Sequence, residues 1–340
     1  MASLLDNKPL RGVNLGGWLV LERWMTPSLF ASTDAQDEYS FMKTPGALAK
    51  LRAHQKSFVG EEDFKWMAAH GVNAVRIPVG YWIFEGDTPY RSCIGRLDWA
   101  IKTAEKYNIR VLICLHGAPG SQSGEHHSGQ IGRALWFGRK DYREQTTAVL
   151  VRLAERYAQR EAVWGIELLN EPKAWIHQLR LRRFYKQAQR GIMNVARPGL
   201  VVVFHDAFMP RSMSGALRMA RGFPVMMDVH WYQFMIPVWI QRRLPLWFNN
   251  LILRKRAQLF ERLSRAQPII VGEWSGVMGW QTLERFPVDR HEAIMHQYLE
   301  QQLDLYGNVA GWFYWNYKTE SRGIFHFRSL IEDGHIARIS

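Results

Sequence analysis

A short apolar run that stops at Asn-Glu-Pro limits most strongly what this chain can fold into. The run spans residues 166–172 and predicts a buried strand that ends before Pro172, because proline cannot continue a hydrogen-bonded ladder. Glu171 should then face a cavity, since a buried carboxylate is costly unless it is paired or used. Residues 268–274 repeat the pattern and contain Glu273. Two buried strands that each end in a glutamate are the central hypothesis about function.

The size of the chain suits one large α/β barrel. It has 340 residues, of which 47% are hydrophobic, enough for a large core. Two cysteines, Cys93 and Cys114, are too few for a disulfide framework, and Cys114 lies in an apolar run that predicts a buried thiol. Residues 1–8 lack the apolar segment of a signal peptide, and no run reaches the roughly 18 apolar residues of a membrane span. We therefore expect a cytoplasmic protein, or a secreted one if a leader has been removed.

Charge and aromatic content bear on the partner. The formal net charge of +13 favours an anionic partner, and the 15 tryptophans favour a ligand with broad, flat faces, such as a sugar. No nucleic-acid-binding module is recognisable, and the positive charge is spread over several predicted helices. We expect no nucleic-acid partner. The sequence does not predict the oligomeric state.

Strand-like runs alternate with helical patterns along the whole chain. The runs are residues 11–15, 73–78, 110–116, 163–170, 200–205, 225–230, 269–273 and 309–315. Helical periodicity covers residues 61–70, 97–107, 142–160, 179–196 and 291–306. This alternation predicts right-handed βαβ units and a parallel sheet. Eight units predict a single (β/α)8 TIM barrel over residues 1–340, with extended βα loops and no linker that would divide it.

Polar or aromatic residues follow nearly every predicted strand. Active sites of barrels lie at the C-terminal ends of the strands. The residues at these ends are Asn14, Glu22, Arg76, His116, Asn170, Glu171, His205, Asp206, His230, Tyr232, Glu273 and Trp315. Each alone has a structural explanation, such as a satisfied buried ion pair, but a core alone does not explain them all.

Enzymes that hydrolyse glycosidic bonds typically use two carboxylates that face each other across the substrate. Two carboxylates about 5 Å apart repel by roughly 3 kcal/mol at an effective dielectric constant of 20, which helps to keep one of them protonated. Arg76, if it lies beside Glu273, would hold that carboxylate ionised and favour its role as nucleophile. Asn170 is placed to bind a sugar hydroxyl, and Trp315 offers a stacking surface.

We expect no metal and no cofactor. The sequence contains neither an H-E-x-x-H motif nor Cys/His spacing typical of a metal site. His126 and His127 form a pair in a predicted loop without a partner motif, and we expect them to be solvated.

Seven blocks of sequence resemble glycoside hydrolase family 5, in particular its exo-β-1,3-glucanase branch. They are residues 11–22, 73–82, 115–122, 169–172, 228–233, 271–274 and 315–320. They span nearly the whole chain in the family's order. The resemblance implies a (β/α)8 barrel that cleaves β-glucosidic bonds with retention by double displacement, most simply exo-acting on β-1,3-glucan.

The resemblance also implies roles for single residues. Glu171 would be the acid/base and Glu273 the nucleophile. The residues implied to bind substrate are Glu22, Arg76, His116, Asn170, His230, Tyr232, Trp315 and Phe234, with Glu22 on the distal hydroxyls. Phe234 and the pair Trp136-Phe137 are candidates for the leaving side. Two stretches depart from the family pattern: Arg23 stands where proline is expected, and residues 125–127 read Glu-His-His.

Residues 234–256 mix large apolar side chains with arginine and lysine, and residues 179–190 add a second basic run. One interpretation is a peripheral membrane contact through 234–256 or a contact with a membrane-bound partner. The other is a long loop and helix that pack on the barrel with solvated charges.

Three other functions fit the same residues. A transglycosylase in bacterial glycan synthesis would use the same two glutamates with a sugar in place of water. A non-catalytic glycan-binding barrel would have no need of the glutamate pair. A protein whose main role is to bind a membrane surface or nucleic acid would show a steep salt dependence of its affinity.

Overall fold

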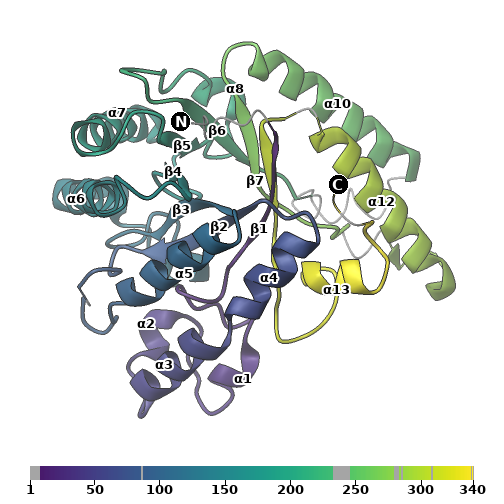
Figure 1. Cartoon of the computed structure of the whole chain (residues 1–340), viewed down its shortest axis with the longest axis horizontal. Helices are drawn as coiled ribbons and strands as arrows, with labels where there is room; N and C mark the ends of the chain where they lie inside the picture. Colours follow the sequence, from purple (N-terminus) through teal and green to yellow (C-terminus); the bar gives the residue numbers. More distant parts are fainter. Residues whose placement is uncertain are drawn as a thin grey trace.

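The computed structural model describes residues 8–85, 87–232, 246–278, 283–284, 286–307, 309–337 and 339. Eight parallel strands form a closed barrel in sequence order, and helices surround it (Figure 1). The strands are β1 (Leu10–Asn14), β2 (Ala74–Gly80), β3 (Arg110–Gly117), β4 (Val163–Glu167), β5 (Val201–His205), β6 (Val225–His230), β7 (Ile269–Trp274) and β8 (Gly311–Tyr314). The predicted (β/α)8 barrel is confirmed.

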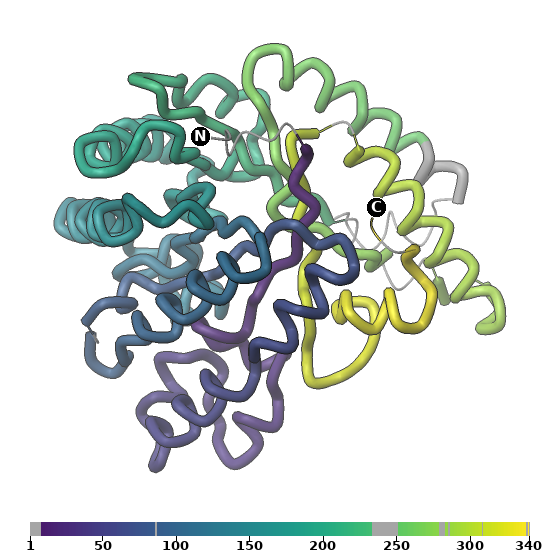
Figure 2. Tube along the Cα trace, viewed as in Figure 1, coloured from purple at the N-terminus to yellow at the C-terminus, as the bar shows by residue number. Residues whose placement is uncertain are grey.

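The barrel closes where its last strand pairs with its first. Leu10 pairs with Gly311 and Val13 with Tyr314. Figure 2 shows the purple first strand running beside the yellow last strand. Both ends of the strand region therefore meet in one ladder, which fixes the positions of the residues that follow β1 and β8.

The long helices lie outside the strands. They are α4 (Glu61–Ala69), α5 (Ile94–Lys106), α6 (Lys140–Arg156), α7 (Gln178–Val195), α10 (Leu246–Ser264) and α12 (His291–Tyr306). The other α-helices are α1 (Pro27–Phe30), α2 (Glu38–Phe41), α3 (Ala47–Ser57), α8 (Pro210–Met213) and α13 (Phe327–Glu332). Within the described residues the 3-10 helices are η1 (His126–Ser128), η2 (Trp136–Gly138) and η4 (Val288–Arg290). Each predicted helical segment overlaps one helix of the outer ring. Among the described helices, none combines the length and apolar character needed to cross a bilayer.

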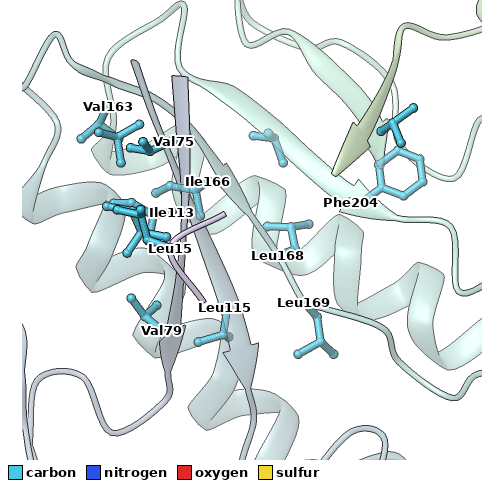
Figure 3. Close-up of a cluster of buried hydrophobic side chains, with 14 of the residues drawn as sticks. Leu15, Val75, Val79, Ile113, Leu115, Val163, Ile166, Leu168, Leu169 and Phe204 are labelled. Carbon is cyan, nitrogen blue, oxygen red and sulfur yellow. The ribbon is translucent and has the colours of Figure 1, made fainter. Parts of the chain in front are cut away.

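Alternation along each strand divides the core into two layers. In β2, Val75 joins the large apolar layer between strands and helices, part of which Figure 3 shows. Its neighbour Ala74 joins a smaller cluster inside the barrel, which includes Leu112 and Phe313. Gly12 is required there, because a Cβ at that position would lie 2.3 Å from the Phe313 ring. The inner cluster fills one end of the barrel and leaves the other end to polar side chains.

Strand β4 ends three residues earlier than the sequence pattern predicts. Its ladder stops at Glu167, yet Leu168 N–H still donates to Val203 O at 2.9 Å and Asn170 N–H to Leu115 O at 2.9 Å. The backbone therefore leaves the regular ladder but stays bonded to both neighbouring strands. Glu171 follows with a φ of 40°, a left-handed conformation that is uncommon for a residue other than glycine. Such outliers gather at functional sites.

Candidate active site

Arg76 is the centre of a buried polar floor at the C-terminal end of the barrel. Its Nε and Nη2 donate to Glu167 at 2.7 and 3.0 Å, and its Nη1 donates to Glu273 Oε1 at 2.8 Å. Nη1 also reaches Asn14 Oδ1 at 2.9 Å, and Nη2 reaches Asn170 Oδ1 at 2.8 Å. One guanidinium thus joins residues from four parts of the barrel. Buried charges are tolerated when they are paired and hydrogen-bonded in this way.

Asn14 and Asp228 complete the floor. The Asn14 amide donates to Gly272 O at 2.9 Å, which turns its oxygen toward Arg76. Asp228 accepts the Gly272 N–H at 2.6 Å and lies 3.9 Å from Arg76 Nε. A side chain at Gly272 would overlap Asp228, because a Cβ there would lie 1.9 Å from its carboxylate. The glycine before Glu273 is therefore needed for the close packing beneath the nucleophile candidate.

The two glutamates singled out from the sequence both approach one nitrogen of His230. His230 Nδ1 is 2.6 Å from Glu171 Oε1 and 3.6 Å from Glu273 Oε2, so these two oxygens are within about 6 Å of each other. Tyr232 donates its hydroxyl to Glu273 Oε2 at 2.9 Å. The structure therefore brings together Glu171, Glu273, Arg76, Asn170, His230 and Tyr232, as the sequence predicted.

Protons in this group are shared among Glu171, His230 and Glu273. Burial opposes the charged form of His230, but Glu273 and Asp228 raise its pKa well above the ordinary value. Burial also works against ionised Glu171, yet the hydrogen bond from His230 holds the pKa of Glu171 below its usual range. In the free site His230 is therefore an imidazolium that donates to Glu171. The three groups titrate together rather than singly.

Burial has the opposite outcome at Glu273. It raises the pKa of this carboxyl group, and the charges of His230 and Arg76 only partly offset the effect. The sequence-based expectation that Arg76 lies beside Glu273 is correct in geometry, with a separation of 2.8 Å. Arg76 favours the ionised form of Glu273, as expected, but its charge does not fully offset the effect of burial on the pKa.

A cavity of about 310 Å³ opens above the floor. It is lined by Glu22, Trp24, His116, His126, His127, Asn170, Glu171, Tyr232, Glu273, Trp315 and Phe325. Trp315 and His116 form one side, with parallel rings 5.7 Å apart. Trp24 and Phe325 form another, with ring centroids 5.0 Å apart in an edge-to-face contact. Flat aromatic walls beside carboxylates suit a sugar ring.

Glu22 lies at the rim of this cavity, in the loop after β1. Its Oε2 accepts from Trp24 Nε1 at 2.9 Å and lies 3.1 Å from His126 Nε2. Burial disfavours charged His126, but its hydrogen bond with Glu22 raises the pKa of His126. The two residues therefore form an ion pair at the edge of the pocket.

His127 contacts the acid/base candidate directly. Its Nε2 lies 3.4 Å from Glu171 Oε2, and its Nδ1 lies 3.3 Å from Asn170 Nδ2. Because Asn170 Oδ1 accepts from Arg76, Asn170 Nδ2 is the donor and His127 Nδ1 the acceptor. Burial lowers the pKa of His127, so the ring is neutral and its remaining proton is on Nε2, facing Glu171. Glu171 thus accepts a hydrogen bond from His230 and also lies 3.4 Å from His127.

These contacts correct the prediction for the histidine pair. His126 and His127 were expected to be solvated, but both line the pocket, and the His127 side chain is only 12% exposed. The loop that carries them is held from below by Gln122, whose Nε2 donates to His116 O at 2.7 Å and to Asn170 O at 2.9 Å. An ion pair between Glu125 and Lys173 adds a link to the loop that follows Glu171.

With this geometry in place, comparison with known proteins identifies the family. A family model described as Cellulase (glycosyl hydrolase family 5) matches residues 41–321. The chain belongs to glycosyl hydrolase family 5. As a member of this family it is an O-glycosyl hydrolase.

Curated relatives of this family 5 chain match it over almost all of its length. A glucan 1,3-β-glucosidase from Blumeria graminis is 35% identical, with 97% of this chain and 87% of the relative covered. The glucan 1,3-β-glucosidase 1 of Schizosaccharomyces pombe is 32% identical, with 92% and 84% covered. Among solved structures, a rutinosidase from Aspergillus niger aligns with a TM-score of 0.77 at 18% identity, covering 96% of this chain and 97% of that one. At this identity the structure supports the fold alone.

Sequence analysis did not identify two carboxylates of the polar floor, Glu167 and Asp228, as site residues. Both are fully buried and face Arg76. The signal was present: each is an acidic residue within an apolar strand, which requires a cationic partner. The partner could not be named, because Arg76 and Glu167 are 91 positions apart.

Other predicted residues lie elsewhere or outside the described part. Trp136 and Phe137 are buried, and Trp136 Nε1 donates to Thr146 at 2.9 Å within the core, so the prediction that they contact the leaving group is wrong. Phe234 lies outside the described residues, as does the first half of segment 234–256. In the described half, Leu253 of α10 is buried with Met278, Ile294 and Tyr298. The free, buried thiol of Cys114 is confirmed.

Two groups of described side chains have the chemistry of metal ligands, with atoms within 4.8 Å: Glu171, His205 and His230, and Glu167, Asp228 and His230. In the second group the cation is Arg76, 2.7 Å from Glu167. In the first, His205 Nδ1 accepts the Ala207 N–H at 2.9 Å, so its Nε2 holds the ring proton and has no free lone pair. The absence of a metal or cofactor stays a prediction.

Proposed function

We propose that this family 5 enzyme removes glucose from the non-reducing end of β-1,3-glucan with retention of configuration. The observation that carries the proposal is that Glu171 and Glu273 both approach His230 Nδ1, at 2.6 and 3.6 Å, which places these two carboxylate oxygens no more than about 6 Å apart. Retaining enzymes place their carboxyl groups about 5–5.5 Å apart, whereas inverting ones leave about 6.5–9.5 Å for a water. The glucan linkage is supported by the names of the curated relatives.

In the first step Glu273 attacks the anomeric carbon and Glu171 donates a proton to the departing glycosidic oxygen. Tyr232 and Arg76 hold the two oxygens of Glu273, with distances of 2.9 and 2.8 Å, so the attacking carboxylate is oriented before substrate arrives. His230 Nδ1 lies 2.6 Å from Glu171 Oε1, and its proton supplies the acid form as the bound sugar displaces water.

In the second step Glu171 removes a proton from water, the water oxygen attacks the anomeric carbon, and Glu273 leaves. Glu171 then acts as a base. The hydrogen bond from His230 and the nearby His127 favour its ionised form, which suits this half of the cycle.

The rim residues favour action at a chain end. Glu22, fixed by Trp24 and His126, closes the pocket beside the catalytic pair, and Trp24 packs against Phe325. A cavity of about 310 Å³ is at the small end of ligand pockets and suits one or two sugar rings. We assign Glu22 to the distal hydroxyls of the terminal glucose, and Trp315 to its face.

Incubation with β-1,3-gluco-oligosaccharides, followed by proton NMR over time, tests the proposal. We expect glucose to appear first as the β-anomer, and Glu273→Gln to abolish turnover while substrate binding survives. Glu261→Gln, at a surface position 69% exposed, is the matched control and should be fully active.

Other outcomes would change the assignment. Products longer than the substrate would identify a transglycosylase, and glucose released first as the α-anomer would contradict retention. Turnover by Glu273→Gln would overturn the choice of nucleophile. If β-1,3-, β-1,4- and β-1,6-linked oligomers all stay intact, the proposed substrate is wrong.

A further inference from the structure

Three large apolar side chains protrude at the start of α7. Trp175 is 73% exposed, Ile176 is 87% exposed and Leu179 is 72% exposed. With Arg180, Arg182 and Arg183 they line a shallow depression of about 680 Å³. We call these six residues the Trp175 patch. Single exposed apolar residues are ordinary on protein surfaces, but three within five positions, rimmed by arginine, mark an interaction site.

The packing of α7 on the barrel does not explain this patch. The helix already has a complete buried face, formed by Leu181, Phe184, Tyr185, Ala188 and Ile192. Trp175 and Ile176 precede the helix, and Leu179 lies on its open side. The apolar surface of these three residues is thus not used in packing α7 on the barrel.

The charge around the patch selects the kind of partner. Residues 178–195 contain five arginines and lysines and no aspartate or glutamate. A solvated helix face usually mixes both signs. Arginine beside exposed tryptophan, isoleucine and leucine is the composition of segments that lie in the interface of an anionic membrane. The formal net charge of +13 acts in the same direction.

We propose that the Trp175 patch seats the protein on the surface of an anionic lipid bilayer. Trp175, Ile176 and Leu179 enter the headgroup region and Arg183 contacts lipid phosphates, while Arg180 and Arg182, which donate to Phe137 O and Ser212 O, add positive charge beside it. Trp175 follows Glu171 by four positions, so the two Cα atoms are at most about 14 Å apart. The bilayer therefore lies near the catalytic residues, and the substrates within reach include glycans that are attached to lipid.

Co-sedimentation with vesicles tests the proposal with the full-length protein. We expect binding to vesicles of equal parts phosphatidylglycerol and phosphatidylcholine, at least tenfold weaker binding to phosphatidylcholine alone, and further weakening in high salt. The triple variant Trp175→Ser, Ile176→Ser, Leu179→Ser should bind anionic vesicles at least tenfold less. The triple variant Arg180→Gln, Arg182→Gln, Arg183→Gln should lose the preference for anionic lipid.

Matched controls separate the patch from bulk composition. Val288→Ser removes an isolated apolar side chain that is 82% exposed. The triple variant Lys65→Gln, Arg265→Gln, Arg322→Gln removes the same charge from exposed positions elsewhere. Both should bind vesicles like the wild type. All variants should hydrolyse a soluble aryl β-glucoside normally, because the changed side chains lie outside the pocket, and the normal activity shows that each variant is folded.

Three results would overturn the proposal. The first is no binding of the wild type to anionic vesicles. The second is equal binding by the apolar triple variant. The third is loss of affinity for insoluble β-1,3-glucan in Trp175→Ser without any change in vesicle binding, which would make Trp175 a stacking platform for glycan instead.

Discussion

The floor and the rim of the active site are built in different ways. On the floor, Arg76, Glu167 and Asp228 extend from strands and are completely buried, and Arg76 pairs with both carboxylates. On the rim, Glu22, His126 and His127 extend from loops; the His126 side chain is 38% exposed and rests on one carboxylate. The difference separates two tasks. The floor holds the reacting carboxylates, and the rim decides which sugar reaches them.

This division predicts that changes on the floor abolish chemistry or folding, while changes on the rim adjust pH dependence and affinity. Four substitutions test it, from the largest expected effect to the smallest.

Glu171→Ala removes the acid/base that joins the two regions. We expect kcat on unactivated β-glucan to fall by about 10²–10⁴, the usual contribution of general acid–base catalysis. An aryl glucoside with a good leaving group should lose much less in its first step. Added azide should restore turnover and yield a β-glucosyl azide, detected by mass spectrometry. A variant that retains full activity on glucan would show that another residue donates the proton.

Arg76→Met leaves the carboxylates of the floor without their cation. Breaking a buried ion pair by removing one partner costs about 3–5 kcal/mol, so the free energy of unfolding in urea should fall by that amount. Arg265→Met is the control, because Arg265 forms only an exposed pair with Glu261 and should change stability by less than about 0.5 kcal/mol. Equal stability of the two variants would mean that the floor does not depend on Arg76.

His127→Gln tests the rim histidine that lies 3.4 Å from Glu171. His127 favours ionised Glu171, so its loss should raise the pKa of Glu171 and move the alkaline limb of kcat/KM to higher pH. The contact is weaker than a hydrogen bond to a charged group, which contributes about 1.5–3 kcal/mol, so activity on that limb should rise by up to about tenfold. His177→Gln, a partly exposed histidine outside the pocket, serves as control. If the alkaline limb of kcat/KM does not shift, His127 has only a structural role.

His126→Gln should have the smallest effect. It removes the ionic partner of Glu22 but keeps a donor of similar reach. We expect KM for β-1,3-oligosaccharides to rise about two- to tenfold, the value of one hydrogen bond, with kcat almost unchanged. A loss of kcat equal to the loss in kcat/KM would place His126 in the transition state rather than at the rim.

The same division explains what could be predicted from the sequence. The strands could be predicted because each is an apolar run of strand length between helical patterns. Glu171 and Glu273 could be predicted as site residues because each places a charge at the end of such a run. Glu167 and Asp228 were not predicted as floor residues. The sequence around each of them shows that a buried carboxylate needs a cation, but it does not show that the closed barrel places Arg76 beside both.

The rim was harder to predict, because no periodic pattern encodes the path of a loop. His126 and His127 are adjacent in a polar stretch, and only the fold turns them toward Glu22 and Glu171. Trp136 and Phe137 show the reverse error, since aromatic residues in a loop were expected at the substrate and instead complete the core.

The Asn14 amide links the beginning of the chain to its end. It donates to Gly272 O, 258 positions later, and to Tyr314 O, 300 positions later, while its oxygen accepts from Arg76. A chain still being synthesised on the ribosome lacks part of the seat of Glu273 until β8 has emerged and paired with β1. Activity should therefore appear only after the barrel has closed, which keeps an unfinished barrel from acting on glycan.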